Sequence, residues 1–154
     1  MKKIVVDSVS RSKYSFVKDI LQAYKDEYKF MAYEHKGYFS NIDTMSGYYE
    51  ANMELLDTDK RNSLFTKAAP IYTKIRDNGP VRFGLESDIK NSLIADGCVI
   101  EGKVENCVLM QDTVVGDKCS ISSVITDKNV EIGDGKVLTG SSSYPLYIGK
   151  NAKI

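Results

Sequence analysis

The sequence predicts a mainly β protein, in which a small α+β segment precedes a parallel β-helix built from hexapeptide repeats. Two observations support this fold class. Most of the tyrosines and the only histidine lie before residue 60, whereas most of the glycines lie after residue 82. The second part also repeats one short pattern at a nearly constant step, which is the signature of a solenoid.

The repeated pattern is an apolar residue, a glycine or acidic residue, two free positions and a small residue. Its starts at 83, 100, 115, 132 and 148 are 17, 15, 17 and 16 residues apart. We expect the apolar starts to point inward, the glycines to adopt unusual corner dihedrals and the small residues to sit near corners. The matching stretches are Phe83–Ser87, Ile100–Val104, Val115–Cys119, Ile148–Ala152 and, in its first positions, Ile132–Asp134.

Two further series run in phase with the first. One comprises Asn91–Ile94, Asn106–Leu109 and Ser122–Ile125, and the other comprises Cys98, Thr113 and Val130. Three short strands in each coil of about 16 to 18 residues describe a triangular β-helix. The step of 15 between residues 100 and 115 suggests one tightened corner.

The first part of the chain alternates helix and strand signals. Apolar residues at helical spacing predict a helix within residues 12–28. Aromatic residues on both sides of Lys36-Gly37 predict a hairpin with arms at 28–35 and 38–42. Thr44 is expected to cap a helix that carries Tyr48, Met53, Leu55 and Leu56. Residues 59–82 are expected to connect the two parts.

Composition excludes several classes of function. The chain has 154 residues with 21 basic and 21 acidic side chains, which gives no support for nucleic-acid binding. No apolar run approaches the roughly 20 residues of a membrane helix, and the start is too short for a signal peptide. The cysteines Cys98, Cys107 and Cys119 form no CxxC pair, so we expect reduced core residues in a cytoplasmic protein and no metal site.

Several separate stretches in order, GYFSNIDTMSGYYEANMELL, PIYTK and SLIADGCVIEGKVENCVL, resemble the glucose-1-phosphate adenylyltransferase family. The resemblance covers roughly residues 14 to 154, and ITDKNVEIGDGKVLTG and SSSYPLYIGKNAKI are similar to the regulatory, non-catalytic bacterial subunit. It implies a left-handed β-helix over 83–154, a connector over 59–82 and, over 1–58, the remnant of a nucleotidyltransferase domain. The parent enzyme would use ATP, glucose 1-phosphate and Mg²⁺ to form ADP-glucose.

The sequence departs from that family at the residues that would carry catalysis. Catalytic members have a pattern like G-Y-W-x-D-V-G-T, whereas residues 37–44 read GYFSNIDT, so that Asn41 replaces the aspartate that helps to hold magnesium. The family's glycine-rich nucleotide loop is absent from the sequence. We therefore expect a substrate-pocket remnant at Tyr38, Phe39, Asn41 and Asp43, with no catalytic residue, no cofactor and no activity of the chain alone.

The resemblance predicts subunit assembly and regulation in glycogen biosynthesis. The expected partner is the catalytic subunit, in a homo- or hetero-oligomer formed through the β-helix. Lys74, Arg76 and Arg82 are candidate contacts for a regulatory phosphate. Two alternatives stay open at this point. One is a hexapeptide-repeat acyltransferase, although His35 lies outside the repeats, and the other is a β-helix assembly module that binds no ligand.

Overall fold

The computed structural model describes residues 2–74 and 77–154, which form two compact units, 2–36 and 37–154. The N-terminal unit contains the α-helix α1 (Lys2–Ser10) and a π-helical segment, η1 (Phe16–Leu21). The sequence predicted one longer helix within 12–28, but Ile20 is buried while Val17 is exposed. Burial therefore gives this segment little of the stabilisation that helices draw from tertiary packing.

The predicted hairpin over residues 28–42 is wrong, because this stretch contains neither helix nor strand. A lone two-stranded hairpin is at best marginally stable in water. Its aromatic residues are largely exposed here, with Tyr33 at 91% and Phe39 at 78%. Without a further sheet or helix to cover them, these residues gain too little burial to hold two paired strands.

Two helices open the second unit, namely α2 (Met45–Glu54) and α3 (Thr58–Leu64). The predicted cap of the first is confirmed, since the Thr44 side chain accepts a hydrogen bond from the Gly47 amide at 3.0 Å. Asp57 caps the second helix in the same way. All of helix α3 except its first residue lies in the predicted connector 59–82, and the predicted domain boundaries stay predictions.

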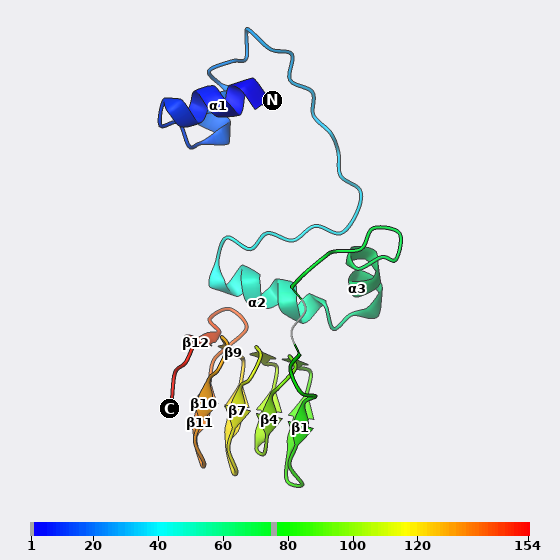
Figure 1. The fold of residues 1–154 in the computed structure, drawn as a ribbon, viewed down its shortest axis with the longest axis vertical. Coiled ribbons are helices and arrows are strands. Elements are labelled where there is room, and N and C mark those ends of the chain that lie inside the picture. The colour runs from blue at the N-terminus through cyan, green and yellow to red at the C-terminus, as the bar shows by residue number, and fades with distance from the viewer. Residues whose placement is uncertain (1, 75–76) are drawn as a thin grey trace. The chain divides into compact units, whose positions relative to one another are not determined.

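Residues 82–154 form a β-solenoid of three parallel four-stranded sheets, which confirms the predicted parallel β-helix. Its left hand stays a prediction. Figure 1 shows the strands of sheet 1 stacked side by side. Sheet 1 contains β1 (Arg82–Phe83), β4 (Val99–Ile100), β7 (Val114–Val115) and β10 (Glu131–Ile132). Sheet 2 contains β2 (Asp88–Lys90), β5 (Lys103–Glu105), β8 (Ser120–Ser122) and β11 (Val137–Thr139). Sheet 3 contains β3 (Leu93–Ile94), β6 (Val108–Leu109), β9 (Val124–Thr126) and β12 (Leu146–Ile148).

The solenoid interior is built from the predicted stacks. Ile100, Val115 and Ile132 lie in register and are fully buried. The third predicted series, Cys98, Thr113 and Val130, is buried as well. All three cysteines are buried and free, as expected of core residues. This stack of buried apolar side chains is the main source of solenoid stability.

The tightened corner lies at Glu101-Gly102. Two residues separate β4 from β5 there, whereas four separate β1 from β2 and β7 from β8. Gly102 is required because a Cβ at this position would lie 2.6 Å from the Cys119 carbonyl oxygen. The sequence pattern misplaced Val104 at a corner. In the structure it is buried within β5 and pairs with Ile89 and Ile121.

The predicted corner role of the second-place glycines is also wrong. Gly116, for example, does not have a positive φ, but a Cβ there would lie 2.9 Å from the Asp134 amide nitrogen. Position 116 therefore needs glycine for close approach between coils and not for its dihedral freedom, whereas a Cβ at Gly149 would meet no atom within 4 Å. In the solenoid, the left-handed backbone conformation is adopted at other positions, most of which are not glycine. Amino-acid types differ in how well they tolerate this conformation. The positions are Asn91, Gly97, Asn106, Asp112, Lys118, Ser123, Asn129, Gly135 and Asn151.

The last coil breaks the predicted phase. Leu146 pairs with Val124, 22 residues earlier, because an inserted loop around Ser141–Tyr144 lengthens this coil. Ile148 therefore pairs with Thr126 in sheet 3 and does not stack on Ile132 as predicted. The third member of the second series is also shifted by one residue, since Val108 pairs with Ile125.

Helix α2 covers the outer surface of sheet 3. Tyr49, which is buried, packs with Val108 and Ile125 of that sheet. The Tyr49 hydroxyl donates a hydrogen bond of 2.6 Å to the Asn106 carbonyl oxygen. Figure 1 shows α2 beside β9 and β12. Within the described part of the chain, no helix has the length and apolar character to span a membrane.

Candidate functional site

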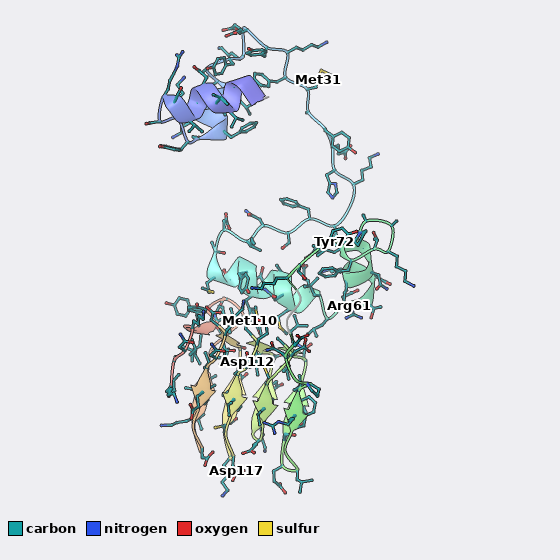
Figure 2. The ribbon with its side chains drawn as sticks, in the orientation of Figure 1. Met31, Arg61, Tyr72, Met110, Asp112 and Asp117 are labelled. Atoms are coloured by element: carbon teal, nitrogen blue, oxygen red, sulfur yellow. The ribbon has the colours of Figure 1, made fainter. Side chains whose placement is uncertain are left out.

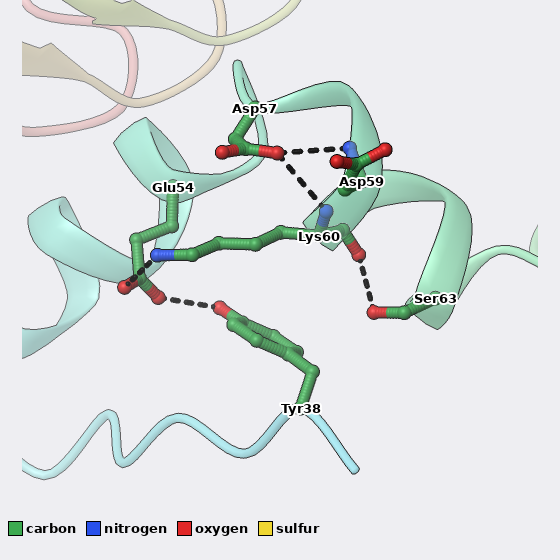
Figure 3. A network of polar contacts seen from close by, with 6 residues as sticks. All are labelled: Tyr38, Glu54, Asp57, Asp59, Lys60 and Ser63. Atoms are coloured by element: carbon green, nitrogen blue, oxygen red, sulfur yellow. Dashed lines mark hydrogen bonds and ion pairs between the residues drawn. The ribbon is translucent and has the colours of Figure 1, made fainter.

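The loop of residues 37–44 leads into α2, and a short polar network fixes its first part. The Tyr38 hydroxyl donates to Glu54 at 2.8 Å, and Lys60 pairs with the other Glu54 oxygen at 2.6 Å. Figure 3 shows how Glu54 lies between these two partners, one from the loop and one from α3. The Glu54 carboxylate thereby joins the loop to both helices.

The network shifts the pKa values of its members in the directions that favour this arrangement. The hydrogen bonds from Lys60 and Tyr38 lower the pKa of Glu54 below its ordinary value. The same contacts raise the pKa of Lys60 and the pKa of the Tyr38 phenol. Glu54 is therefore charged, and Tyr38 keeps its proton as a hydrogen-bond donor, across the neutral pH range.

Asn41 and Asp43 form the second part of the loop. The Asn41 amide donates to an Asp43 carboxylate oxygen at 3.0 Å, and both side chains are exposed. Gly47 allows the loop to approach the helix, because a Cβ there would lie 2.8 Å from the Asn41 carbonyl oxygen. Asn41 and Asp43 thus interact directly and carry one negative charge between them.

The four predicted pocket residues do not share one cavity. Tyr38 and Phe39 line a shallow groove of about 330 Å³ whose other wall includes Ala51 and Leu55. Asp43 instead lines a larger cavity of about 620 Å³. Asn41 lines neither. The predicted remnant is therefore divided between two cavities, which share Ile42 and Tyr48 in their linings.

The larger cavity, called the α2 cavity below, lies between the start of α2 and sheet 3. Figure 2 shows Met110, one of its lining residues, below α2 near the ends of the strands. Its walls combine aromatic, apolar and charged side chains. They include Asp43, Tyr48, Met110, Asp127, Lys128 and Tyr147.

The repeat pattern gave no reason to select the solenoid residues of this cavity. Register places Met110 and Asp127 at equivalent positions of successive coils, because Leu109 pairs with Thr126. One is apolar and the other is charged, so no periodic signal marks them. Tyr147 enters the site because the inserted loop of the last coil changes the phase of β12.

The candidate phosphate contacts are not brought together with either cavity. Lys74 and Arg82 are exposed, and neither lines the groove or the α2 cavity. Arg76 lies outside the described residues. A regulatory phosphate site formed by these side chains stays a prediction.

The loop does not suit the magnesium ion that the resemblance implies for the parent enzyme. The position of the expected aspartate holds Asn41, whose amide nitrogen donates to Asp43. Magnesium favours several oxygen ligands with carboxylate charge, and the pair offers one carboxylate. Among residues 2–74 and 77–154, no cluster of three or more His, Cys, Asp or Glu side chains could hold a metal ion.

The histidine that an acyltransferase would need is also absent from the coils. His35 is exposed and belongs to the N-terminal unit, and residues 82–154 contain no histidine in their sequence. A histidine general base beside the coils is thus not supplied by the solenoid itself. No observation in the described residues favours this alternative.

Comparison with known proteins agrees with this architecture. Residues 85–142 match the family described as GlmU-like, C-terminal hexapeptide. The chain is 34% identical over 158 aligned positions to the glycogen biosynthesis protein GlgD of Bacillus subtilis, a match that covers 92% of this chain and 46% of that protein. GlgD of Geobacillus stearothermophilus is 37% identical over 108 positions, covering 54% of this chain and 32% of the relative.

Enzymes of the same group match as well. Glucose-1-phosphate adenylyltransferase of Bacillus subtilis is 35% identical over 114 positions, which cover 73% of this chain and 30% of the enzyme. The chain thus spans less than half the length of these curated relatives. The matches are those expected for the C-terminal portion of a longer protein.

Proposed function

Because this chain belongs to the glucose-1-phosphate adenylyltransferase family, we propose that it serves glycogen biosynthesis as the C-terminal part of a regulatory subunit. In this proposal the catalytic enzyme forms ADP-glucose from ATP and glucose 1-phosphate. The present chain contributes contacts that assemble and regulate that enzyme. The relatives that carry a glycogen-biosynthesis name support the pathway.

The observation that carries the non-catalytic part of the proposal is the Asn41–Asp43 pair. The amide replaces a carboxylate and interacts with the only acidic side chain nearby in the loop. A catalytic metal would lose one charged ligand there, and with it the neutralisation of charge that develops on phosphoryl oxygens. The loop is nevertheless anchored through Tyr38 and Glu54. The loop therefore keeps a defined shape but lacks the carboxylate charge that would help to hold a catalytic metal.

The end of the solenoid supports the assembly role. Sheet 1 ends at β1, sheet 2 at β2 and sheet 3 at β3, so the first coil has one edge without a β partner among the described residues. Solenoid ends need a cap, another domain or a partner. At this end Phe83 is 58% exposed and Leu85 is fully exposed. An apolar surface beside unpaired strands suits a protein–protein contact.

A kinetic titration tests the proposal. The glucose-1-phosphate adenylyltransferase of the same organism is assayed for pyrophosphate release while the chain is added in increasing ratio. We expect its rate, its KM or its response to fructose 1,6-bisphosphate to change and to saturate at a fixed ratio. The chain alone should release no pyrophosphate. The regulatory role is rejected if none of these parameters changes, and the non-catalytic role is rejected if the chain alone is active.

A matched pair of variants locates the contact. Leu85→Asp places a charge at the solenoid end and should raise the ratio needed for saturation at least tenfold. Tyr72→Asp alters a residue that is 91% exposed outside the solenoid and should leave the titration unchanged. Equal effects of the two variants would argue against an assembly surface at this end.

A further inference from the structure

We propose that the α2 cavity binds a neutral carbohydrate, such as the glucosyl units of an oligosaccharide. This ligand is neither a phosphate nor a nucleotide, and the proposal does not depend on assembly with a catalytic subunit. The cavity of about 620 Å³ lies between the start of α2 and sheet 3. Its size falls within the ordinary range of small-molecule sites.

Side chains of two chemical kinds line the cavity. Tyr48, Met110 and Tyr147 provide an aromatic and apolar surface. Asp43, Asp127 and Lys128 supply the charged groups. A pyranose ring has an apolar face of C–H groups and a rim of hydroxyls. A cavity with a few polar groups placed beside aromatic rings is suited to such a ligand.

The Asp127 carboxylate is held in place before any ligand binds. One oxygen accepts the Lys128 backbone amide at 2.7 Å, and the other lies 3.5 Å from the Tyr147 hydroxyl. A carboxylate has about four acceptor positions, so Asp127 can still accept hydrogen bonds from two neighbouring hydroxyls. Tyr147 thereby contributes a ring face, and its hydroxyl lies near the acceptor.

Asp43 also lines the cavity and supplies a second acceptor. One of its oxygens accepts a hydrogen bond from the Asn41 amide at 3.0 Å, which restrains the Asp43 side chain. The other oxygen has no hydrogen bond to any of the described residues. The Lys128 ammonium lines the same cavity and forms no ion pair within the described part of the chain. The site therefore offers two acceptors and one donor to a polyhydroxyl ligand.

Charge balance excludes an anion as the preferred ligand. Asp43 and Asp127 contribute two negative charges, and Lys128 contributes one positive charge. The N-terminus of α2 adds roughly half a positive charge. The net charge is therefore about −0.5, which repels phosphate groups but permits hydrogen bonds from neutral hydroxyls.

Calorimetric titration of the chain with maltotriose tests the proposal. The cavity is open, so we expect saturable binding with a Kd of about 1 mM. Asp127→Asn should weaken binding about tenfold, because a hydrogen bond to a charged acceptor is lost. Tyr147→Ala should abolish detectable binding. Tyr72→Ala is the matched control and should bind as the unmodified chain does.

Two further measurements separate the outcomes. NMR titration should shift the amides of residues 43–48 and 126–128, which provides a readout that does not depend on any variant. Glucose 1-phosphate and inorganic phosphate are titrated in parallel. The proposal is overturned if binding of maltotriose does not saturate at concentrations up to 50-fold above the expected Kd. It is also overturned if maltotriose shifts the NMR signals only of amides distant from the cavity. Tighter binding of inorganic phosphate than of maltotriose at this cavity would also overturn the proposal, since the site would then prefer an anionic ligand.

Discussion

The tightened corner at Glu101-Gly102 makes Gly102→Ala the sharpest test of the coil geometry. The added Cβ would lie 2.6 Å from the Cys119 carbonyl oxygen and 2.8 Å from the Cys119 Cβ. Both atoms belong to the next coil, so relief requires the backbone to move. Overpacking of this kind costs about 1–3 kcal/mol. A domain of this size loses about 2–4 °C in Tm for each kcal/mol, so we expect a drop of about 2–12 °C.

Gly149→Ala is the matched control for this prediction. An added Cβ at Gly149 meets no atom within 4 Å, and its φ is not positive. It should be neutral or stabilising by up to about 1 kcal/mol, through reduced entropy of the unfolded chain. Thermal melts followed by circular dichroism compare the two variants. Equal Tm values for both would refute the assignment of the short corner to Glu101-Gly102.

Three other properties follow from the contacts described above. Tyr49→Phe leaves the Asn106 carbonyl without its 2.6 Å hydrogen bond and should lower the free energy of unfolding by about 1–3 kcal/mol in urea titrations; an unchanged midpoint would count against docking of α2. The contact with Lys60 lowers the pKa of Glu54 from its ordinary value of 4.5. The stabilisation that this contact gives the folded chain is therefore present above pH 4.5 and is lost as the pH falls below it. Glu54→Gln should therefore flatten the loss of stability in acid, and an unchanged acid profile would exclude the network. Burial raises the pKa of Cys107 to about 11, so a thiol reagent at pH 8 should modify this residue only after unfolding; modification in the folded protein at the rate of a free thiol would contradict its burial.

The solenoid could be predicted from the sequence because its signal is periodic. Ile100, Val115 and Ile132 repeat at steps that match the observed register. Prediction failed where the period changes. The loop around Ser141–Tyr144 shifts Ile148 into another sheet. The sequence does not reveal this shift, because an apolar residue followed by glycine fits the pattern of either sheet.

The candidate site was predictable only in part, because its walls come from distant stretches. The loop residues Tyr38 and Asp43 could be selected by resemblance, but they line different cavities. Asp127 and Tyr147 occupy solenoid positions that carry no pattern of their own, and they meet only through the pairing of β9 with β12. Long-range pairing of this kind leaves no local trace in the sequence.

The proposed assembly of this chain with a catalytic glucose-1-phosphate adenylyltransferase can be tested directly. Light scattering after size exclusion, on the chain mixed with that enzyme from the same organism, tests it most directly. We expect co-elution at a defined stoichiometry, which Leu85→Asp should reduce and Tyr72→Asp should leave unchanged. Separate elution of the two proteins at micromolar concentrations, with the chain folded, would contradict the assembly role of residues 83–154.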